Sequence, residues 1–150
     1  MNDLSDLYQE IIMDHRRNPR NEGLPKDHTH TADGFNPFCG DKVSVAVKIE
    51  DGSIADVGFK GEGCAISMAS ASLMTETVSG KSVDDATASF EAFRTLLTDG
   101  VGDNSEDLDI GDAGALAGVR AYPTRIKCAI LSWHTFKSAL DNEAAPVTTE

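Results

Sequence analysis

The spacing of apolar residues predicts several helices along the chain. In segment 4–17 the apolar residues recur every three or four positions, and the Asn18-Pro19 pair that follows ends the periodicity. In segment 64–79 small side chains dominate and neither Gly nor Pro interrupts them, which favours a closely packed helix that ends at Gly80. Further helices are expected near 82–97, around 113–118 and from 122 to about 140.

Two stretches between the first helices alternate apolar and polar residues, as a β-strand with one buried face does. The apolar positions are Val43, Val45, Val47 and Ile49 in the first stretch and Ala55, Val57 and Phe59 in the second. The Asp51-Gly52 pair between them is a strong signal for a tight hairpin turn. Because the first strand begins where the second ends, residue 41 is expected close to residues 61–64.

Length and charge limit the classes of protein. The chain has 150 residues, of which 40% are hydrophobic and 25% charged, so we expect one soluble domain over 1–150, with a polar tail that frays from about 141 to 150. The net charge of −12 argues against nucleic acid or an anionic membrane as a partner. No apolar run approaches the roughly 20 residues of a membrane span, and the acidic N-terminus is unlike a signal peptide, so a cytoplasmic location is expected.

An acidic segment interrupts the helical part of the sequence. Residues 98–112 include six acidic side chains, three glycines and no basic residue, so a loop is expected. Two interpretations stay open for its charge. It either steers a basic protein partner during association or is a solvated loop without a specific role.

The candidate chemistry lies at the cysteines. There are three, an odd number that cannot all pair within one chain, and a reducing cytosol would leave them unpaired. They are therefore buried thiols, metal ligands or reactive groups. Cys39 lies in the stretch Asn36-Pro37-Phe38-Cys39-Gly40-Asp41, which cannot be helical. If its backbone is extended, Cys39 and Asp41 point to the same side, and the hairpin brings Cys64 near both.

Cys64 and Cys128 are each expected near a helix N-terminus, where free amides and the helix dipole favour a thiolate. Arg125 and Lys127 flank Cys128 and favour its thiolate further. The glycines at 61 and 63 either remove bulk beside Cys64 or serve as turn residues. His15, His28 and His30 are interpreted as ordinary surface or core residues, and His134 is expected at the surface.

Three thiolates and one carboxylate suit a tetrahedral zinc ion. Cys39, Asp41, Cys64 and Cys128 are therefore the candidate zinc ligands. A full set of four ligands is typical of a closed, structural site, although a zinc-bound thiolate that can leave the metal remains a potential nucleophile.

The three cysteine motifs resemble those of the IscU/NifU N-terminal family. The matching stretches are Asn36 to Asp41, Gly61-Glu62-Gly63-Cys64 through Ser72, and Arg125-Ile126-Lys127-Cys128-Ala129, and the segment from Leu7 to Asn21 resembles the family's first helix. The resemblance covers nearly the whole chain. It implies an α+β, IscU/SufE-like fold with a small three-stranded antiparallel sheet packed against helices, whose additional strand would lie around 29–34.

Two departures from the scaffold branch of that family, IscU, match its sulfurtransferase branch, SufU. Lys127 stands where IscU has a His before the third cysteine, and the acidic insertion near 99–122 is absent from IscU. The resemblance thus implies a zinc protein that takes persulfide sulfur from the cysteine desulfurase SufS and passes it to the SufBCD scaffold. It also implies that Cys39 accepts the sulfur, once a His of the desulfurase replaces it on zinc.

Two alternatives remain at this point. The chain could be an IscU-type scaffold on which an iron–sulfur cluster is built, or a purely structural zinc domain that serves as an adaptor. Zinc bound to thiolates is colourless and a cluster is brown, so absorption spectra separate the first alternative, and transfer of labelled sulfur separates the second.

Overall fold

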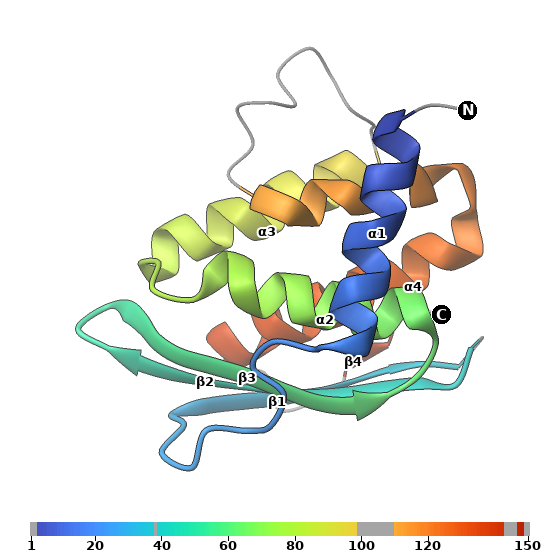
Figure 1. Cartoon of the computed structure of the whole chain (residues 1–150). Helices are drawn as coiled ribbons and strands as arrows, with labels where there is room; N and C mark the ends of the chain where they lie inside the picture. The colour runs from blue at the N-terminus through green and yellow to red at the C-terminus, as the bar shows by residue number, and fades with distance from the viewer. Residues whose placement is uncertain (1–2, 38, 99–109, 143–146, 149–150) are drawn as a thin grey trace.

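All described helices lie on one face of a four-stranded sheet in the computed structural model (Figure 1), which describes residues 3–37, 39–98, 110–142 and 147–148. The strand order is β3-β2-β1-β4. The strands are β1 (His30–Asn36), β2 (Asp41–Glu50), β3 (Ser53–Glu62) and β4 (Val147–Thr148). β2 pairs antiparallel with both β1 and β3, which confirms the expected α+β fold and the additional strand before Cys39.

The sheet has one strand more than the three expected from the family resemblance. Val147 and Thr148 pair in parallel with Gly34 and Phe35 of β1, so the sheet is mixed and has four strands rather than three. The tail's polar sequence gave no sign of this pairing, because two residues are too few to show a period.

The helices follow the apolar spacing of the sequence. They are α1 (Asp3–Arg17), α2 (Ala65–Val78), α3 (Val83–Thr98), the 3-10 helix η2 (Gly111–Ala121) and α4 (Pro123–Leu140). The Ser82 hydroxyl accepts a hydrogen bond from the Asp85 amide and caps α3, as the sequence predicted. The short helix expected around 113–118 is longer than predicted and of the 3-10 type.

The core lies between the sheet and the helices. Phe59 of β3, Leu73 of α2 and Phe136 of α4 are buried there, and Phe93 stacks on Trp133 with ring centroids 4.1 Å apart. Small residues let α2 pack closely on several neighbours, and the buried Ser70 hydroxyl accepts a hydrogen bond from Trp133 Nε1 at 3.1 Å. No described helix is long and apolar enough to cross a membrane.

The β2–β3 hairpin forms as predicted, with one difference. Asp51 and Gly52 have φ values of 52° and 76°, the left-handed geometry of a two-residue hairpin turn. An irregularity between Lys48 and Ile49 shifts the pairing register. Ile54 is therefore buried and Ala55 exposed, so the prediction that Ala55 faces the core is wrong.

Two other expectations can be compared with the structure. His134 is not a surface residue, because it is half-buried and its ring lies edge-on to Phe90 with centroids 5.3 Å apart.

Most of the acidic segment, residues 99–109, lies outside the described residues. Its end is described, and there Ile110 is buried against the helices.

Candidate metal centre

Asp41 is the first residue of β2 and lies at the centre of the candidate site. It pairs across the strands with Asn36, so residues 37–40 form a short connection between β1 and β2. Gly40 in this connection has a φ of 72°, a conformation that suits glycine. The backbone between Cys39 and Asp41 is therefore not extended, so the condition for two side chains on the same side of a strand is not met. The turn nevertheless brings the two side chains together, at one end of the sheet.

The Asp41 carboxylate is fully buried and held by two donors. Its Oδ1 accepts a hydrogen bond from the Cys64 amide at 2.8 Å, and its Oδ2 accepts one from Asn36 Nδ2 at 3.1 Å. Buried carboxylates require such partners, because water no longer solvates them. The backbone amide of Cys64, the N-cap of α2, thus binds the side chain of Asp41, the first residue of β2.

Gly63 makes room for that carboxylate. A Cβ placed on Gly63 would overlap the Asp41 side chain, and one placed on Gly61 would overlap the backbone of Lys42. Of the two roles considered for these glycines, the structure therefore supports the removal of side-chain bulk rather than the role of turn residues. At Gly63 the space is used by the Asp41 side chain next to Cys64, and at Gly61 it is used by the neighbouring strand.

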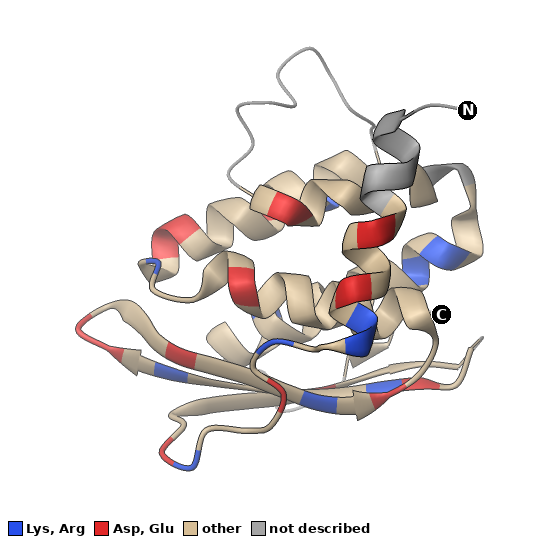
Figure 2. Ribbon diagram, viewed as in Figure 1, with Lys and Arg blue, Asp and Glu red and all other residues tan. Residues whose placement is uncertain are grey.

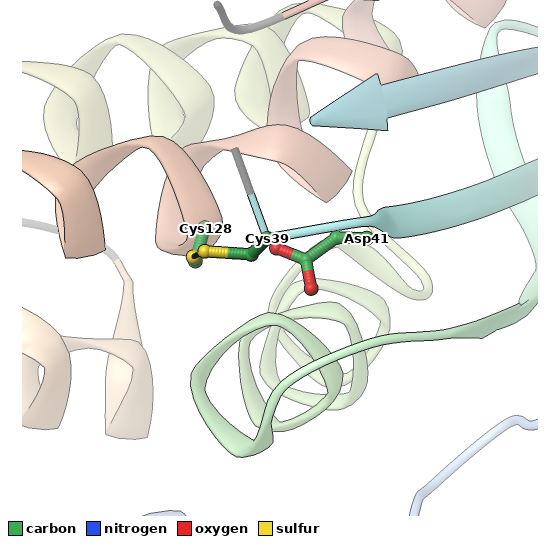
Figure 3. A group of neighbouring side chains, drawn as sticks. All are labelled: Cys39, Asp41 and Cys128. Carbon is green, nitrogen blue, oxygen red and sulfur yellow. Dashed lines mark hydrogen bonds between the residues drawn. The ribbon is translucent and has the colours of Figure 1, made fainter. Parts of the chain in front are cut away.

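The sulfur atoms of Cys39 and Cys128 lie 3.3 Å apart, although 89 positions separate them in sequence. Figure 3 shows Cys39 coming from the β1–β2 turn, Cys128 from α4 and Asp41 from the start of β2. Asn36 Nδ2 also lies 3.5 Å from the Cys128 sulfur. Asn36 thereby bridges the carboxylate and one of the thiols.

Cys128 is buried, whereas Cys39 is exposed. Burial raises the pKa of the Cys128 thiol, and its contact with Cys39 adds to the rise. Burial thus opposes the favourable effect on a Cys128 thiolate that is expected from the helix start and from the flanking Arg125 and Lys127. A cation among these donors would offset the cost of a buried negative charge.

The donor atoms of Cys39, Asp41 and Cys128 all lie within 4.8 Å of one another. Cys64 is beside this group, with its sulfur 4.0 Å from Asp41 Oδ2, and it accepts a hydrogen bond from the Ser67 amide as the N-cap of α2. Thiolates around a tetrahedral zinc are about 3.8 Å apart, given Zn–S bonds of about 2.3 Å. The 3.3 Å between Cys39 and Cys128 is close to this spacing, so the donor set fits a zinc ion.

The sequence analysis missed Asn36 as a site residue. Its signal was present in the strand pattern, because Ala32, Gly34 and Asn36 share the buried face of β1 and Asn36 alone of the three is polar. A buried carboxamide at the end of a strand needs partners. Here the partners are Asp41 and Cys128.

Residues 7–129 match the model of the NifU-like N terminal domain. The chain is 41% identical over 140 residues to the zinc-dependent sulfurtransferase SufU of Bacillus subtilis, with 93% of each chain covered. It is 38% identical to the iron-sulfur cluster assembly scaffold protein IscU of Streptococcus pyogenes, covering 94% of this chain and 87% of that one.

A solved structure resembles the fold closely. It is the putative iron-sulfur cluster assembly scaffold protein for the SUF system from Fervidobacterium islandicum, with a TM-score of 0.80 and 31% identity. The match covers 87% of this chain and 94% of that chain.

Proposed function

Because the chain belongs to the family of NifU-like N-terminal domains and is similar to proteins named as a zinc-dependent sulfurtransferase and as iron–sulfur cluster assembly scaffolds, we propose that it is a zinc-dependent sulfurtransferase. In this role it accepts persulfide sulfur from a cysteine desulfurase of the SufS type and passes it to a SufBCD-type scaffold. The observation that carries the proposal is the position of the buried Asp41 carboxylate among three thiols, a set that suits zinc better than it suits disulfide chemistry. The family and the first relative's name agree with it.

In this proposal Cys39, Asp41, Cys64 and Cys128 hold the zinc. The ion, when bound, keeps the thiols deprotonated and protects them from oxidation between transfers. Asn36 and the Cys64 amide orient the Asp41 carboxylate. Gly63 leaves the space in which that carboxylate lies.

Cys39 is the proposed sulfur acceptor because it is the exposed cysteine and lies in a short turn. Cys128, in contrast, is buried within α4, and Cys64 caps α2. The Cys39 thiolate attacks the outer sulfur of the desulfurase persulfide. A sulfur–sulfur bond forms on Cys39 as the one on the desulfurase breaks, and the desulfurase cysteine leaves as a thiolate, so no external oxidant or reductant is needed.

Mass spectrometry of the tryptic peptides tests this role directly. The protein is incubated with desulfurase and cysteine, alkylated, and digested with trypsin under non-reducing conditions. Cleavage after lysine places each cysteine on its own peptide: 27–42, 61–81 and 128–137. We expect a gain of one sulfur on peptide 27–42, and Cys39→Ala should abolish both this gain and the stimulation of the desulfurase.

Lys127→Ala is the matched control, because it changes a residue next to a proposed ligand but removes no donor from the set. It should retain the adduct on peptide 27–42. Extra sulfur found mainly on one of the other two peptides would show that the assignment of Cys39 is wrong.

A scaffold role is the second candidate, because the chain is also 38% identical to a protein named as an IscU scaffold. Lys127 at the position before the third cysteine argues against it, since the scaffold branch has a His there. Absorption spectra and elemental analysis of anaerobically purified protein separate the two. A colourless protein with about one zinc per chain supports the sulfurtransferase, and a brown protein with iron and sulfide supports the scaffold.

A further inference from the structure

A second group of potential metal ligands lies on the helical side of the molecule, away from the cysteines. His15 of α1, Glu76 of α2 and Asp112 of η2 each offer a donor atom, and these atoms all lie within 4.8 Å of one another. Glu76 is twelve positions after Cys64, which corresponds to roughly 18 Å along a helix. The two groups are therefore separate sites, at opposite ends of α2.

His15 is the buried member of this group, with a relative exposure of 2%. Its Nδ1 lies 2.7 Å from the Ser72 hydroxyl, which fixes the ring orientation. Its Nε2 faces the carboxylates and lies 3.8 Å from Glu76 Oε1, too far for a hydrogen bond. Among the residues that the structure describes, Nε2 makes no hydrogen bond to the protein, and it faces the carboxylates of Glu76 and Asp112.

The contact between His15 Nδ1 and the Ser72 hydroxyl resembles the support that metal-binding histidines receive. A ligating imidazole normally donates its other ring N–H to an oxygen, which leaves the ligating nitrogen unprotonated. The Ser72 hydroxyl also accepts a hydrogen bond from the Arg20 amide at 2.8 Å, so it is itself held in place. In the tautomer with the proton on Nδ1, the Ser72 hydroxyl accepts a hydrogen bond from the ring, and Nε2 carries the lone pair that a metal ion needs.

The charge around His15 Nε2 favours a cation. Glu76 and Asp112 are exposed and acidic, and Figure 2 shows acidic residues on α1, α2 and α3. Arg20 is the nearby positive charge, but its closer ion pair is with Asp14, at 2.6 Å against 3.9 Å to Glu76. The exposed carboxylates can rotate toward the nitrogen without disturbing the core.

We propose that His15, Glu76 and Asp112 bind a divalent first-row transition ion such as Mn²⁺ or Fe²⁺, in a site independent of the cysteines. One imidazole nitrogen and two carboxylates are a donor set that these ions accept, whereas the thiol-rich site selects softer ions. Three protein ligands leave the remaining positions to water. The ion would connect α1, α2 and the start of η2.

Mn²⁺ is the probe that separates the two sites, because it is the weakest competitor of its series and does not displace zinc from thiolates. Zinc-loaded protein is titrated with Mn²⁺, and free Mn²⁺ is measured by electron paramagnetic resonance. We expect saturable binding of one Mn²⁺ per chain. The double variant Glu76→Gln/Asp112→Asn should weaken it by at least about tenfold, the scale of effects seen when the surroundings of a metal are altered.

Asp84→Asn/Asp85→Asn is the matched control, because it also removes two exposed carboxylates, both from α3 and outside the proposed site. It should leave Mn²⁺ binding unchanged. Equal binding by the control and the Glu76→Gln/Asp112→Asn variant would mean that the ion senses only the overall negative charge, and this result would overturn the proposal, as would the absence of saturable binding.

Nuclear magnetic resonance shows where the Mn²⁺ ion binds. Substoichiometric Mn²⁺ should broaden the ring signals of His15 before those of His28, in the polar loop before β1, and of His30, the first residue of β1. Broadening of all the histidines together would contradict the proposed site. Because the cysteines are filled with zinc throughout, the outcome does not depend on the sulfurtransferase role.

Discussion

Replacing Asn36 by alanine tests how far the metal centre depends on a residue that is not itself a proposed ligand. Asn36 is fully buried and donates from Nδ2 to Asp41 Oδ2 at 3.1 Å, and the same nitrogen lies 3.5 Å from the Cys128 sulfur. The substitution keeps the backbone pairing of residues 36 and 41. It removes the side-chain donor and leaves a small cavity beside a buried carboxylate.

The expected magnitudes follow from these contacts. A hydrogen bond to a charged group contributes about 1.5–3 kcal/mol when its loss leaves the partner unsatisfied, so we expect the metal-free variant to lose about 2 kcal/mol of unfolding free energy. Loss of a residue that orients a metal ligand typically weakens metal binding about 10- to 100-fold. We expect zinc affinity to fall within that range.

Two measurements check the prediction. Urea unfolding of metal-free protein gives the stability change, and competition with a chromophoric chelator gives the zinc affinity. Asn18→Ala is a matched control, because Asn18 Nδ2 donates to Asp14 Oδ1 at the same 3.1 Å but at an exposed position. It should alter neither quantity measurably, since solvent replaces the lost bond.

The reasoning would be refuted if Asn36→Ala and Asn18→Ala had equal effects, because burial of the bond would then contribute nothing. It would also fail if stability fell and zinc affinity did not. In that case Asn36 would support the fold rather than the ligand.

Three further outcomes are expected. Gly63→Ala should weaken zinc binding because its Cβ displaces the Asp41 side chain, whereas Gly118→Ala, with open space at its Cβ, should bind zinc like the parent protein in the same chelator competition. Zinc removal by a chelator should lower the melting temperature clearly, with a loss of unfolding free energy smaller than the order of 10 kcal/mol that zinc contributes in small peptides, and an unchanged melting curve would rule out a structural contribution. Burial lowers the pKa of both His134 and His15, so the unfolded chain binds more protons than the folded protein does. The free energy of unfolding should therefore fall as the pH drops from about 6.5 through the lowered pKa values. His134→Gln should reduce that loss, as measured by urea unfolding at several pH values.

Local features of the sequence predicted most of the elements. The Asp51-Gly52 turn, the alternation around Val45 and the Ser82 cap each depend on residues a few positions apart, so a window of ten residues contains the whole signal. The hairpin in turn explains why Cys64 lies near Asp41. The family resemblance supplied the strand that the polar sequence of residues 30–36 did not predict.

Features that depend on contacts between segments far apart in the chain could not be predicted from short sequence windows. Ala55 faces solvent because it is the extra residue where the pairing of β2 with β3 shifts register, and β4 forms because β1 offers it a free edge. His134 is half-buried because Phe90, on a different helix, lies against it.

The sequence by itself determined which residue types could act together, whereas the tertiary structure decided how they are held. The cysteines and Asp41 were candidates from their chemistry alone. The two donors to Asp41, the space at Gly63 and the arrangement of His15 with Glu76 and Asp112 were decided by packing between segments far apart in the chain. The physical reason is that burial and hydrogen-bond partners depend on which elements meet, and a local pattern contains no information about its eventual neighbours.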